Sequence, residues 1–289
     1  MYYFLVSFCW LTALLPLRVL YLLADISYLL VYHVFGYRKN IVRGNLANSF
    51  PEKSTSELLV IEKRFYRFFC DLFIETIKQI NMGEKEMKRR MVYENPEVLS
   101  DKDTAGKSIM LMTAHYGNWE WMGSLPLWAP ADKPLYGVYK KLSSGTFDKL
   151  MCLIRSKFGD INIEKRLLLR LMVQLRSKNQ PALFGMIADQ SPRRRNIDYW
   201  TPFLNQDTPV LTGTEELARK FDYPVFYIDI RCVKRGYYRC KLVPISLQPK
   251  MAAEYEITRK YIGLLEETIA RQPEYWLWSH RRWKYKRQQ

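Results

Sequence analysis

The chain has 289 residues, 48% of them hydrophobic, and can bury a full core as one large α/β domain with a helical preface or as two domains. Its formal net charge of +16 indicates attraction to a polyanion, either nucleic acid or the anionic face of a membrane. Five cysteines without a C-x-x-C pair argue against a disulfide scaffold and a zinc ribbon, and suit a reducing compartment.

The N-terminal segment favours the membrane. Residues 1–17 carry no charged side chain, and apolar runs resume at 19–23 and 28–32. A spanning helix needs about 20 apolar residues, so the first run is marginal. There is no basic n-region and no clear small-residue cleavage site, which argues against a removed signal peptide. We expect residues 1–35 to form one or two helices that lie in or cross a bilayer, with the basic residues 36–289 on the cytoplasmic side. The alternative is a buried helical hairpin of a soluble protein.

The remainder predicts an α/β fold. Ser54 or Ser56 can cap a strongly amphipathic helix that ends at Gly83, with an aromatic stripe that we interpret as packing surface. Beyond residue 105, apolar runs alternate with helical patterns, so we expect a mixed, mostly parallel sheet covered by helices on both faces. The expected strands are 108–113, 135–140, 182–189, 224–232 and 238–244, the last two forming a hairpin. The expected helices are 118–125, 146–158, 164–178, 212–221 and 253–271.

One motif carries the clearest chemistry. His115 follows the buried strand directly, and Glu120 comes five residues later. An imidazole is the usual base for taking a proton from a hydroxyl near neutral pH, and a nearby carboxylate can fix its tautomer. If Asn118 caps a helix, Glu120 lies in its first turn and can approach His115. The alternative is a buried histidine satisfied by a carbonyl.

Two later stretches also carry possible chemistry. Asp189 and Gln190 end a buried strand and can line the same cleft as His115, although a loop-capping Asp fits as well. Arg193–Arg195 can grip phosphates or form a solvated face. The tail, 276–287, interleaves aromatic and basic residues, which suits the interfacial zone of a bilayer or single-stranded nucleic acid.

Four blocks in order resemble the late acyltransferases of lipid A biosynthesis, a family of glycerolipid acyltransferase-like fold. The likeness covers most of the chain. The four blocks are Tyr37-Arg38-Lys39-Asn40 with Asn45-Leu46-Ala47-Asn48-Ser49-Phe50-Pro51; Ala114-His115-Tyr116-Gly117-Asn118-Trp119-Glu120; Asp189-Gln190 with Thr201-Pro202-Phe203-Leu204 and Gly213; and Pro273-Glu274-Tyr275-Trp276-Leu277-Trp278-Ser279-His280-Arg281-Arg282-Trp283. The chain departs from the family at Leu204-Asn205, where the family has Phe-Gly, and in the Arg193–Arg195 loop.

The resemblance implies an enzyme of the bacterial inner membrane whose catalytic domain, 36–289, faces the cytoplasm behind a membrane segment, 1–35. It implies transfer of a fatty acyl group from acyl carrier protein to a hydroxyl of a lipid A precursor, without cofactor or metal. By analogy His115 is the general base, Glu120 orients it, and Arg155 and Asp189 are further active-site residues.

Acyl transfer itself needs a base and donors to the oxyanion. No serine or cysteine lies in a nucleophile elbow, which favours direct attack. Candidate oxyanion donors are the backbone N–H groups near Gly117 and Asn118, or Arg155, while Trp119, Trp121 and Met122 can line an acyl groove. Two alternatives remain at this point. One is an acyltransferase for a lysophospholipid or aminolipid, and the other is a non-catalytic basic protein that binds a membrane or nucleic acid.

Overall fold

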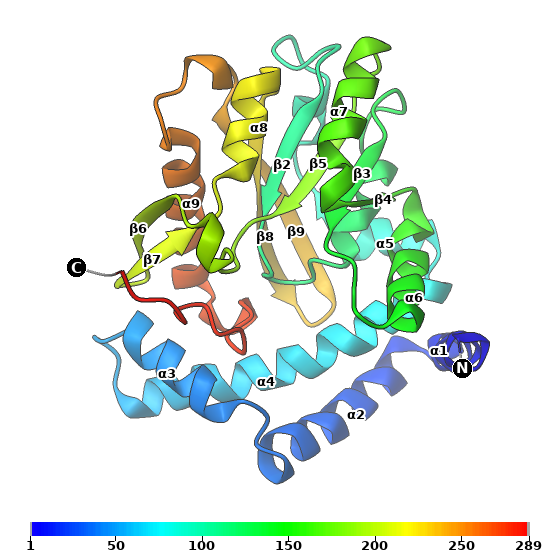
Figure 1. Ribbon diagram of the computed structural model, residues 1–289. Helices are drawn as coiled ribbons and strands as arrows, with labels where there is room; N and C mark the ends of the chain where they lie inside the picture. Colours follow the sequence, from blue (N-terminus) through cyan, green and yellow to red (C-terminus); the bar gives the residue numbers. More distant parts are fainter. Residues whose placement is uncertain (1, 288–289) are drawn as a thin grey trace.

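A computed structural model describes residues 2–287 and contains a mixed sheet of seven strands in the order β1-β9-β8-β2-β5-β3-β4 (Figure 1). The five strands from β8 to β4 run parallel, β9 returns antiparallel to β8, and β1 pairs parallel with β9. The strands are β1 (Met91–Tyr93), β2 (Ile109–Thr113), β3 (Leu135–Tyr139), β4 (Ile161–Glu164), β5 (Leu183–Ile187), β8 (Val225–Lys234) and β9 (Tyr237–Ser246). A separate antiparallel pair is formed by β6 (Tyr199–Phe203) and β7 (Gln206–Val210). The predicted mixed, mostly parallel α/β fold is confirmed.

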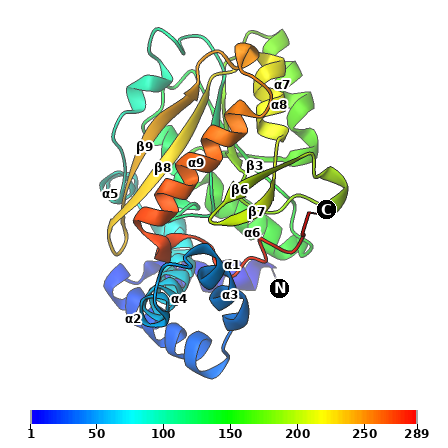
Figure 2. The same ribbon diagram turned by 90° about the vertical axis from the view of Figure 1, so that its left-hand side faces the viewer.

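Helices surround this sheet on both faces and along one edge. The α-helices are α1 (Tyr2–Leu14), α2 (Leu17–Tyr28), α3 (Lys39–Ser49), α4 (Thr55–Lys78), α5 (Glu84–Arg90), α6 (Gly145–Arg155), α7 (Leu168–Ser177), α8 (Gly213–Phe221) and α9 (Glu256–Arg271). A π-helical segment, η1 (Leu29–Val34), continues α2, and a 3-10 helix, η4 (Trp121–Leu127), follows β2. Helices α8 and α9 pack on one face of the sheet, whereas α5 and η4 pack on the other (Figures 1 and 2).

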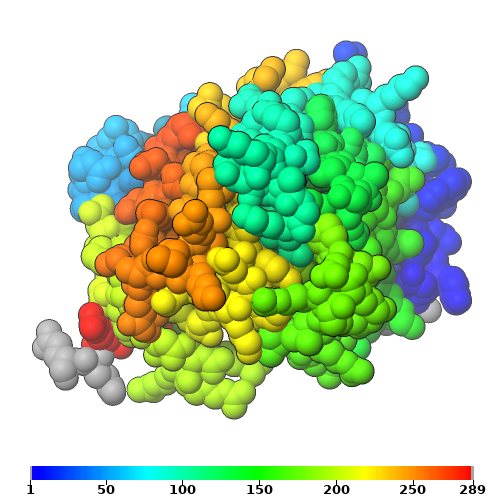
Figure 3. All heavy atoms as spheres, turned by 90° about the horizontal axis from the view of Figure 1, so that it is seen from above, coloured from blue at the N-terminus to red at the C-terminus, as the bar shows by residue number. Residues whose placement is uncertain are grey.

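The helices α1 to α4 form a layer beneath the edge at which the parallel strands end (Figure 1). Figure 3 shows the molecule from the opposite end, where loops at the amino ends of the strands cover the surface and the N-terminal helices are visible only at the rim. The carboxyl ends of the strands, where α/β sheets place reactive groups, therefore face the helical layer.

Helix α4 forms as its sequence predicts. Ser54 and Glu57 make a reciprocal capping box, and the last turn passes into a 3-10 helix, Gln79–Asn81, before Gly83. Its apolar stripe buries Ile61 and Phe65 in the main core, and Leu72 is buried as well. The stripe is not purely apolar, because Glu62, Asp71 and Glu75 are also buried on this helix. Each of these carboxylates accepts hydrogen bonds from other elements.

Helix α2 lies against α4 with one face. Leu20, Ala24, Tyr28 and Tyr32 follow one another at intervals of four residues and are all buried in the core that contains the sheet. The segment Leu17–Val34 has 18 residues with a mean hydropathy of 1.4, so its length and composition allow it to cross a membrane. The core helix of a soluble protein passes the same criteria.

Glu75 joins this helical layer to the sheet. Its carboxylate is fully buried and accepts hydrogen bonds from the Tyr21 hydroxyl of α2 (2.7 Å), the Tyr238 hydroxyl of β9 (2.8 Å) and the Asn118 amide (2.7 Å). Burial raises the pKa of Glu75 to about 7, against the lowering effect of the three donors. The buried charge is therefore costly above neutral pH.

We expect Glu75→Gln to stabilise the protein at alkaline pH and to change little near pH 4.5. The pKa of Glu75 is about 7 in the folded protein, against an ordinary value of 4.5. The free energy of unfolding of the native protein therefore falls as the pH rises from 4.5 to 7. The loss at pH 8 is about 3 kcal/mol. The amide can keep the network, because the Tyr21 hydroxyl can turn to accept from it.

Chemical unfolding at pH 5 and pH 8 measures this difference, with the exposed Glu254→Gln as the matched control. An equal effect of Glu75→Gln at both pH values would show that the carboxyl does not titrate in this range.

Candidate functional site

The register of two central strands brings His115 and Asp189 together. In the parallel pair β2–β5, Thr113 lies opposite Ile187, so the second residue beyond each strand is His115 on one side and Asp189 on the other. His115 Nδ1 lies 2.7 Å from Asp189 Oδ1, and the His115 backbone N–H donates to Asp189 Oδ2 at 3.0 Å. The structure thus brings into contact two residues that the sequence analysis singled out separately.

The Asp189 carboxylate is buried but well supplied with donors. Its side chain is 2% exposed, whereas that of His115 is 21% exposed. The Trp276 indole N–H adds a third hydrogen bond at 2.9 Å. Although burial alone raises the pKa of Asp189, the charge of His115 and these hydrogen bonds hold it below the ordinary value. An anionic Asp189 holds the proton on His115 Nδ1, so Nε2 carries the lone pair that can accept a proton.

The C-terminal segment clamps the loop that carries His115. Tyr116 and Trp276 form an antiparallel bridge, the Gly117 N–H donates to the Tyr275 carbonyl, and the Leu277 N–H donates to the His115 carbonyl. Gly117 has φ of +56°, and a Cβ there would lie 2.9 Å from Ile230 Cγ2. Only glycine fits this position without strain.

Glu120 does not orient His115, which corrects the expectation from the sequence. Within residues 2–287 no hydrogen bond joins the two side chains, and Asp189 takes the orienting position. Glu120 instead receives two hydrogen bonds from Arg155, at 2.7 Å from Nε and 2.8 Å from Nη2, and one from the Trp119 indole at 3.1 Å. The predicted helix 118–125 is also wrong, since the 3-10 helix begins at Trp121, whose N–H donates to the Asn118 side chain.

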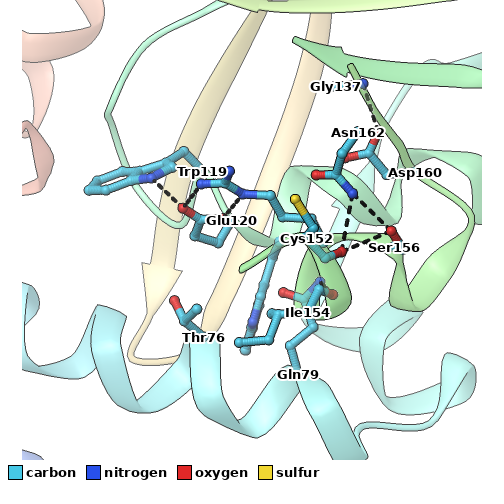
Figure 4. Close-up of polar contacts among 12 residues, drawn as sticks. Thr76, Gln79, Trp119, Glu120, Gly137, Cys152, Ile154, Ser156, Asp160 and Asn162 are labelled. Atoms are coloured by element: carbon cyan, nitrogen blue, oxygen red, sulfur yellow. Dashed lines mark hydrogen bonds and ion pairs between the residues drawn. The ribbon is translucent and has the colours of Figure 1, made fainter. Parts of the chain in front are cut away.

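Arg155 ends α6, and this helix end is held from two sides (Figure 4). Gln79 of the 3-10 helix that follows α4 donates to the Ile154 carbonyl, and Asn162 of β4 donates to the Cys152 carbonyl. Asp160, which precedes β4, accepts a hydrogen bond from the Gly137 N–H at 2.8 Å. Burial raises the pKa of Asp160 to about 7.

The close approach of Asp160 requires a glycine at position 137, because a Cβ there would lie 2.5 Å from Asp160 Oδ2. The sequence analysis did not single out Asp160, because one acidic residue after a glycine forms no recognisable motif.

The remaining predicted site residues fall into two groups. Trp119 and Gln190 border His115: the Trp119 ring meets the imidazole edge-on at 5.2 Å between centroids, and the Gln190 amide nitrogen lies 3.3 Å from His115 Nε2. Asn118 is buried, with its side chain bonded to Glu75 and Trp121. The sequence analysis expected the Gly117 N–H to be an oxyanion donor. This N–H instead donates to the Tyr275 carbonyl, so it is not available for that role.

The tail differs from its expected place at a lipid interface. Trp276, Trp278 and Arg282 are buried beside the site, while Arg281, Lys284 and Lys286 are exposed. Burial lowers the pKa of Arg282 to about 10, and its Nε and Nη1 atoms have no hydrogen-bond partner within residues 2–287. The alternation of aromatic and basic residues did not distinguish a buried clamp from a lipid-facing strip.

Arg193, Arg194 and Arg195 are all exposed and lie around a short 3-10 helix. This placement agrees with the solvated-face interpretation of the arginine run.

The arrangement can therefore perform proton transfer. It offers a partly exposed imidazole with Nδ1 fixed by a buried carboxylate and Nε2 beside the Gln190 amide. A second, separate ion pair on the far side of Trp119 presents a guanidinium whose side chain is 25% exposed. These are the parts that addition of a hydroxyl to a carbonyl needs: a base for the proton and a cation for developing negative charge.

Comparison with known proteins agrees with this chemistry. A search of curated proteins found no match. The family model for bacterial lipid A biosynthesis acyltransferases matches residues 1–285, which is nearly the whole chain. The protein is therefore a member of the bacterial lipid A biosynthesis acyltransferase family.

Proposed function

We propose that this protein transfers a fatty acyl chain from the thioester of acyl carrier protein to a hydroxyl group of a lipid A precursor, with His115 as the general base. The observation that carries the proposal is the Asp189–His115 hydrogen bond of 2.7 Å, which holds the proton on Nδ1 of a partly exposed imidazole and leaves Nε2 as the proton acceptor. Family membership supports an acyltransferase of lipid A biosynthesis, and the site geometry supports the role of each residue.

The reaction needs no covalent acyl-enzyme. The acceptor hydroxyl gives its proton to His115 Nε2 while its oxygen attacks the thioester carbonyl carbon. The resulting tetrahedral oxyanion collapses, the C–S bond breaks, and the imidazolium returns its proton to the leaving thiolate. Asp189 stabilises the imidazolium throughout, as a buried carboxylate does in other histidine bases.

We assign the oxyanion contact to Arg155 rather than to the Gly117 amide. Glu120 occupies Nε and Nη2 of Arg155, and Nη1 has no hydrogen bond within residues 2–287. A guanidinium held at two nitrogens is a preorganised donor at the third. Glu120 then acts through Arg155 as a positioning residue.

We further propose that the enzyme acts at the cytoplasmic face of the bacterial inner membrane, with residues 1–35 as its membrane segment and 36–289 as its catalytic domain. The apolar N-terminal helices support membrane association. The net charge of +16 suits both the acidic carrier protein and a phosphorylated lipid acceptor.

We expect His115→Ala and Asp189→Asn each to lower kcat by roughly 10²- to 10⁴-fold, because both remove proton transfer by a correctly oriented imidazole. Single-turnover transfer of a radiolabelled acyl chain measures the effect. Asp222→Asn is the matched control, because Asp222 ends α8 with a left-handed backbone that asparagine also adopts. Near-normal transfer by folded His115→Ala would exclude His115 as the base.

We expect Arg155→Lys to lower kcat by roughly 10²-fold, because lysine cannot bind Glu120 through two nitrogens and present a third. Glu120→Gln releases the same guanidinium, so the double variant Glu120→Gln/Arg155→Lys should lose little more than Arg155→Lys alone. Additive losses in this double-mutant cycle would show that the two residues act independently.

Donor and acceptor are tested with the purified protein. Incubation with acyl carrier protein thioester and a lipid A precursor should give a product heavier by one acyl chain, with one free carrier thiol for each chain transferred. Mass spectrometry identifies the product. Transfer to a lysophospholipid or aminolipid, but not to the precursor, would show that the proposed acceptor is wrong. Equal transfer rates with a coenzyme A thioester would show that acyl carrier protein is not the preferred donor.

A further inference from the structure

We propose that α1, α2 and η1 lie within one leaflet of an anionic bilayer and do not cross it, so that both ends of this segment stay on the side of the catalytic domain. This proposal rests on the membrane association proposed above but not on the acyl transfer chemistry.

The outer surface of these helices is apolar. More than half of the exposed large apolar side chains among residues 2–287 belong to the first 37 residues. We call this surface the apolar face. Its members are Tyr3, Phe4, Phe8, Trp10, Leu11, Leu14, Leu15, Val19, Leu22, Leu23, Ile26, Leu29, Leu30, Val34, Phe35 and Tyr37. Patches of this kind on a protein surface mark interaction sites.

The inner surface of α2 is fastened to the catalytic body along its length. The Tyr21 hydroxyl donates to Glu75, the Tyr32 hydroxyl donates to Glu62, and Asp25 pairs with Arg235 at 2.7 Å. Arg235 belongs to the turn between β8 and β9 and also pairs with Asp71 of α4. Figures 1 and 2 show α2 running alongside α4 beneath the sheet.

An upright α2 would have to leave α4. That movement would break these bonds and uncover the buried face of α2, from Leu20 to Tyr32. It would also carry Asp25 and the exposed Arg18 toward the hydrocarbon, where a charged side chain is strongly disfavoured. An in-plane helix keeps the bonds and still buries the apolar face among the acyl chains.

Helix α1 cannot cross by itself. Its 13 residues are about 20 Å long, whereas the hydrocarbon core is about 30 Å thick. Its end is tied to the body, because Lys78 of α4 donates to the carbonyls of Ala13 and Leu15 at 2.8 and 3.0 Å. Cys9 packs against Leu150 and Ile154 of α6. The corner between α1 and α2 therefore stays beside the catalytic domain.

Basic side chains near the apolar face suit anionic headgroups. Arg67 of α4 and Lys39 of α3 lie over the Tyr28 and Tyr32 rings, at 5.2 and 3.7 Å from the centroids, and so flank the inner face of this segment. Arg18, Arg38 and Arg67 are exposed. Cations close to an anionic leaflet are attracted to its headgroups. The exposed charge of Asp25 is compensated by Arg235. The occupant of this face is therefore an anionic lipid surface.

Topology is tested first. A protease-sensitive peptide placed before Met1 should be digested in inside-out membrane vesicles and protected in intact spheroplasts. Digestion in spheroplasts would show that the segment crosses the bilayer and would overturn the proposal, whatever the enzyme activity.

The surface is tested with Leu22→Glu/Ile26→Glu on α2. Cosedimentation of this variant with phosphatidylglycerol-containing vesicles should fall by roughly tenfold or more, because two apolar side chains of the membrane contact become charged. The matched control is Leu169→Glu/Val173→Glu, which places the same charges on two exposed apolar residues of α7, away from the N-terminal helices. Unchanged binding of the α2 variant, or equal loss in the α7 variant, would overturn the proposal.

Acyl transfer in detergent micelles separates this proposal from the proposed function. The α2 variant should keep transfer within about twofold of the native protein in micelles, because its changes point away from the body. A native protein that binds vesicles as expected but transfers no acyl chain would contradict the proposed function and leave the in-plane placement supported.

Discussion

The pairing register of β2 and β5 is the constraint on which the site depends. It sets Thr113 opposite Ile187, so that His115 and Asp189 leave the sheet side by side. A carboxylate as buried as Asp189 is stable only when its oxygens are well supplied with donors. The imidazole, the backbone of the same histidine and the Trp276 indole provide them. The orientation of His115 is thus a consequence of satisfying a buried anion.

The loop after β2 is rigid because three parts of the chain hold it. The C-terminal segment pairs with it through Trp276, Glu75 of α4 binds Asn118, and Arg155 of α6 binds Glu120. None of these partners is a neighbour in sequence. A loop tied in this way presents its groups without first losing conformational freedom, which is what preorganised proton transfer and charge stabilisation require.

The helical layer has two opposite tasks in our proposals. Its inner side supports the carboxyl edge of the sheet, where Glu75 connects α2 and α4 to the His115 loop through Asn118. Its outer side carries the apolar face that we propose to enter a leaflet. The reacting edge of the sheet would then be held a short way above the lipid headgroups, where an acceptor anchored by its own acyl chains resides.

Local pattern determined the class of fold, the central strand 108–113, the capped helix from Ser54 and the 224–244 hairpin, because each has strong periodicity or capping of its own. It also identified His115, Asp189 and Glu120, whereas Arg155 came only from the resemblance to the family. Strands β1 and β4 were missed because three or four residues carry too little periodicity, and β6 and β7 were missed because each contains a proline, which argues against a strand. Only the tertiary structure decided which acid serves the histidine: Asp189 is 74 residues away and Glu120 five, yet strand register brings the distant one into contact while Arg155 engages the near one. The tertiary structure also decided that Trp276 and Trp278 are buried in the protein. The composition of the tail predicts an apolar environment for these rings, but it does not tell whether protein or lipid provides that environment.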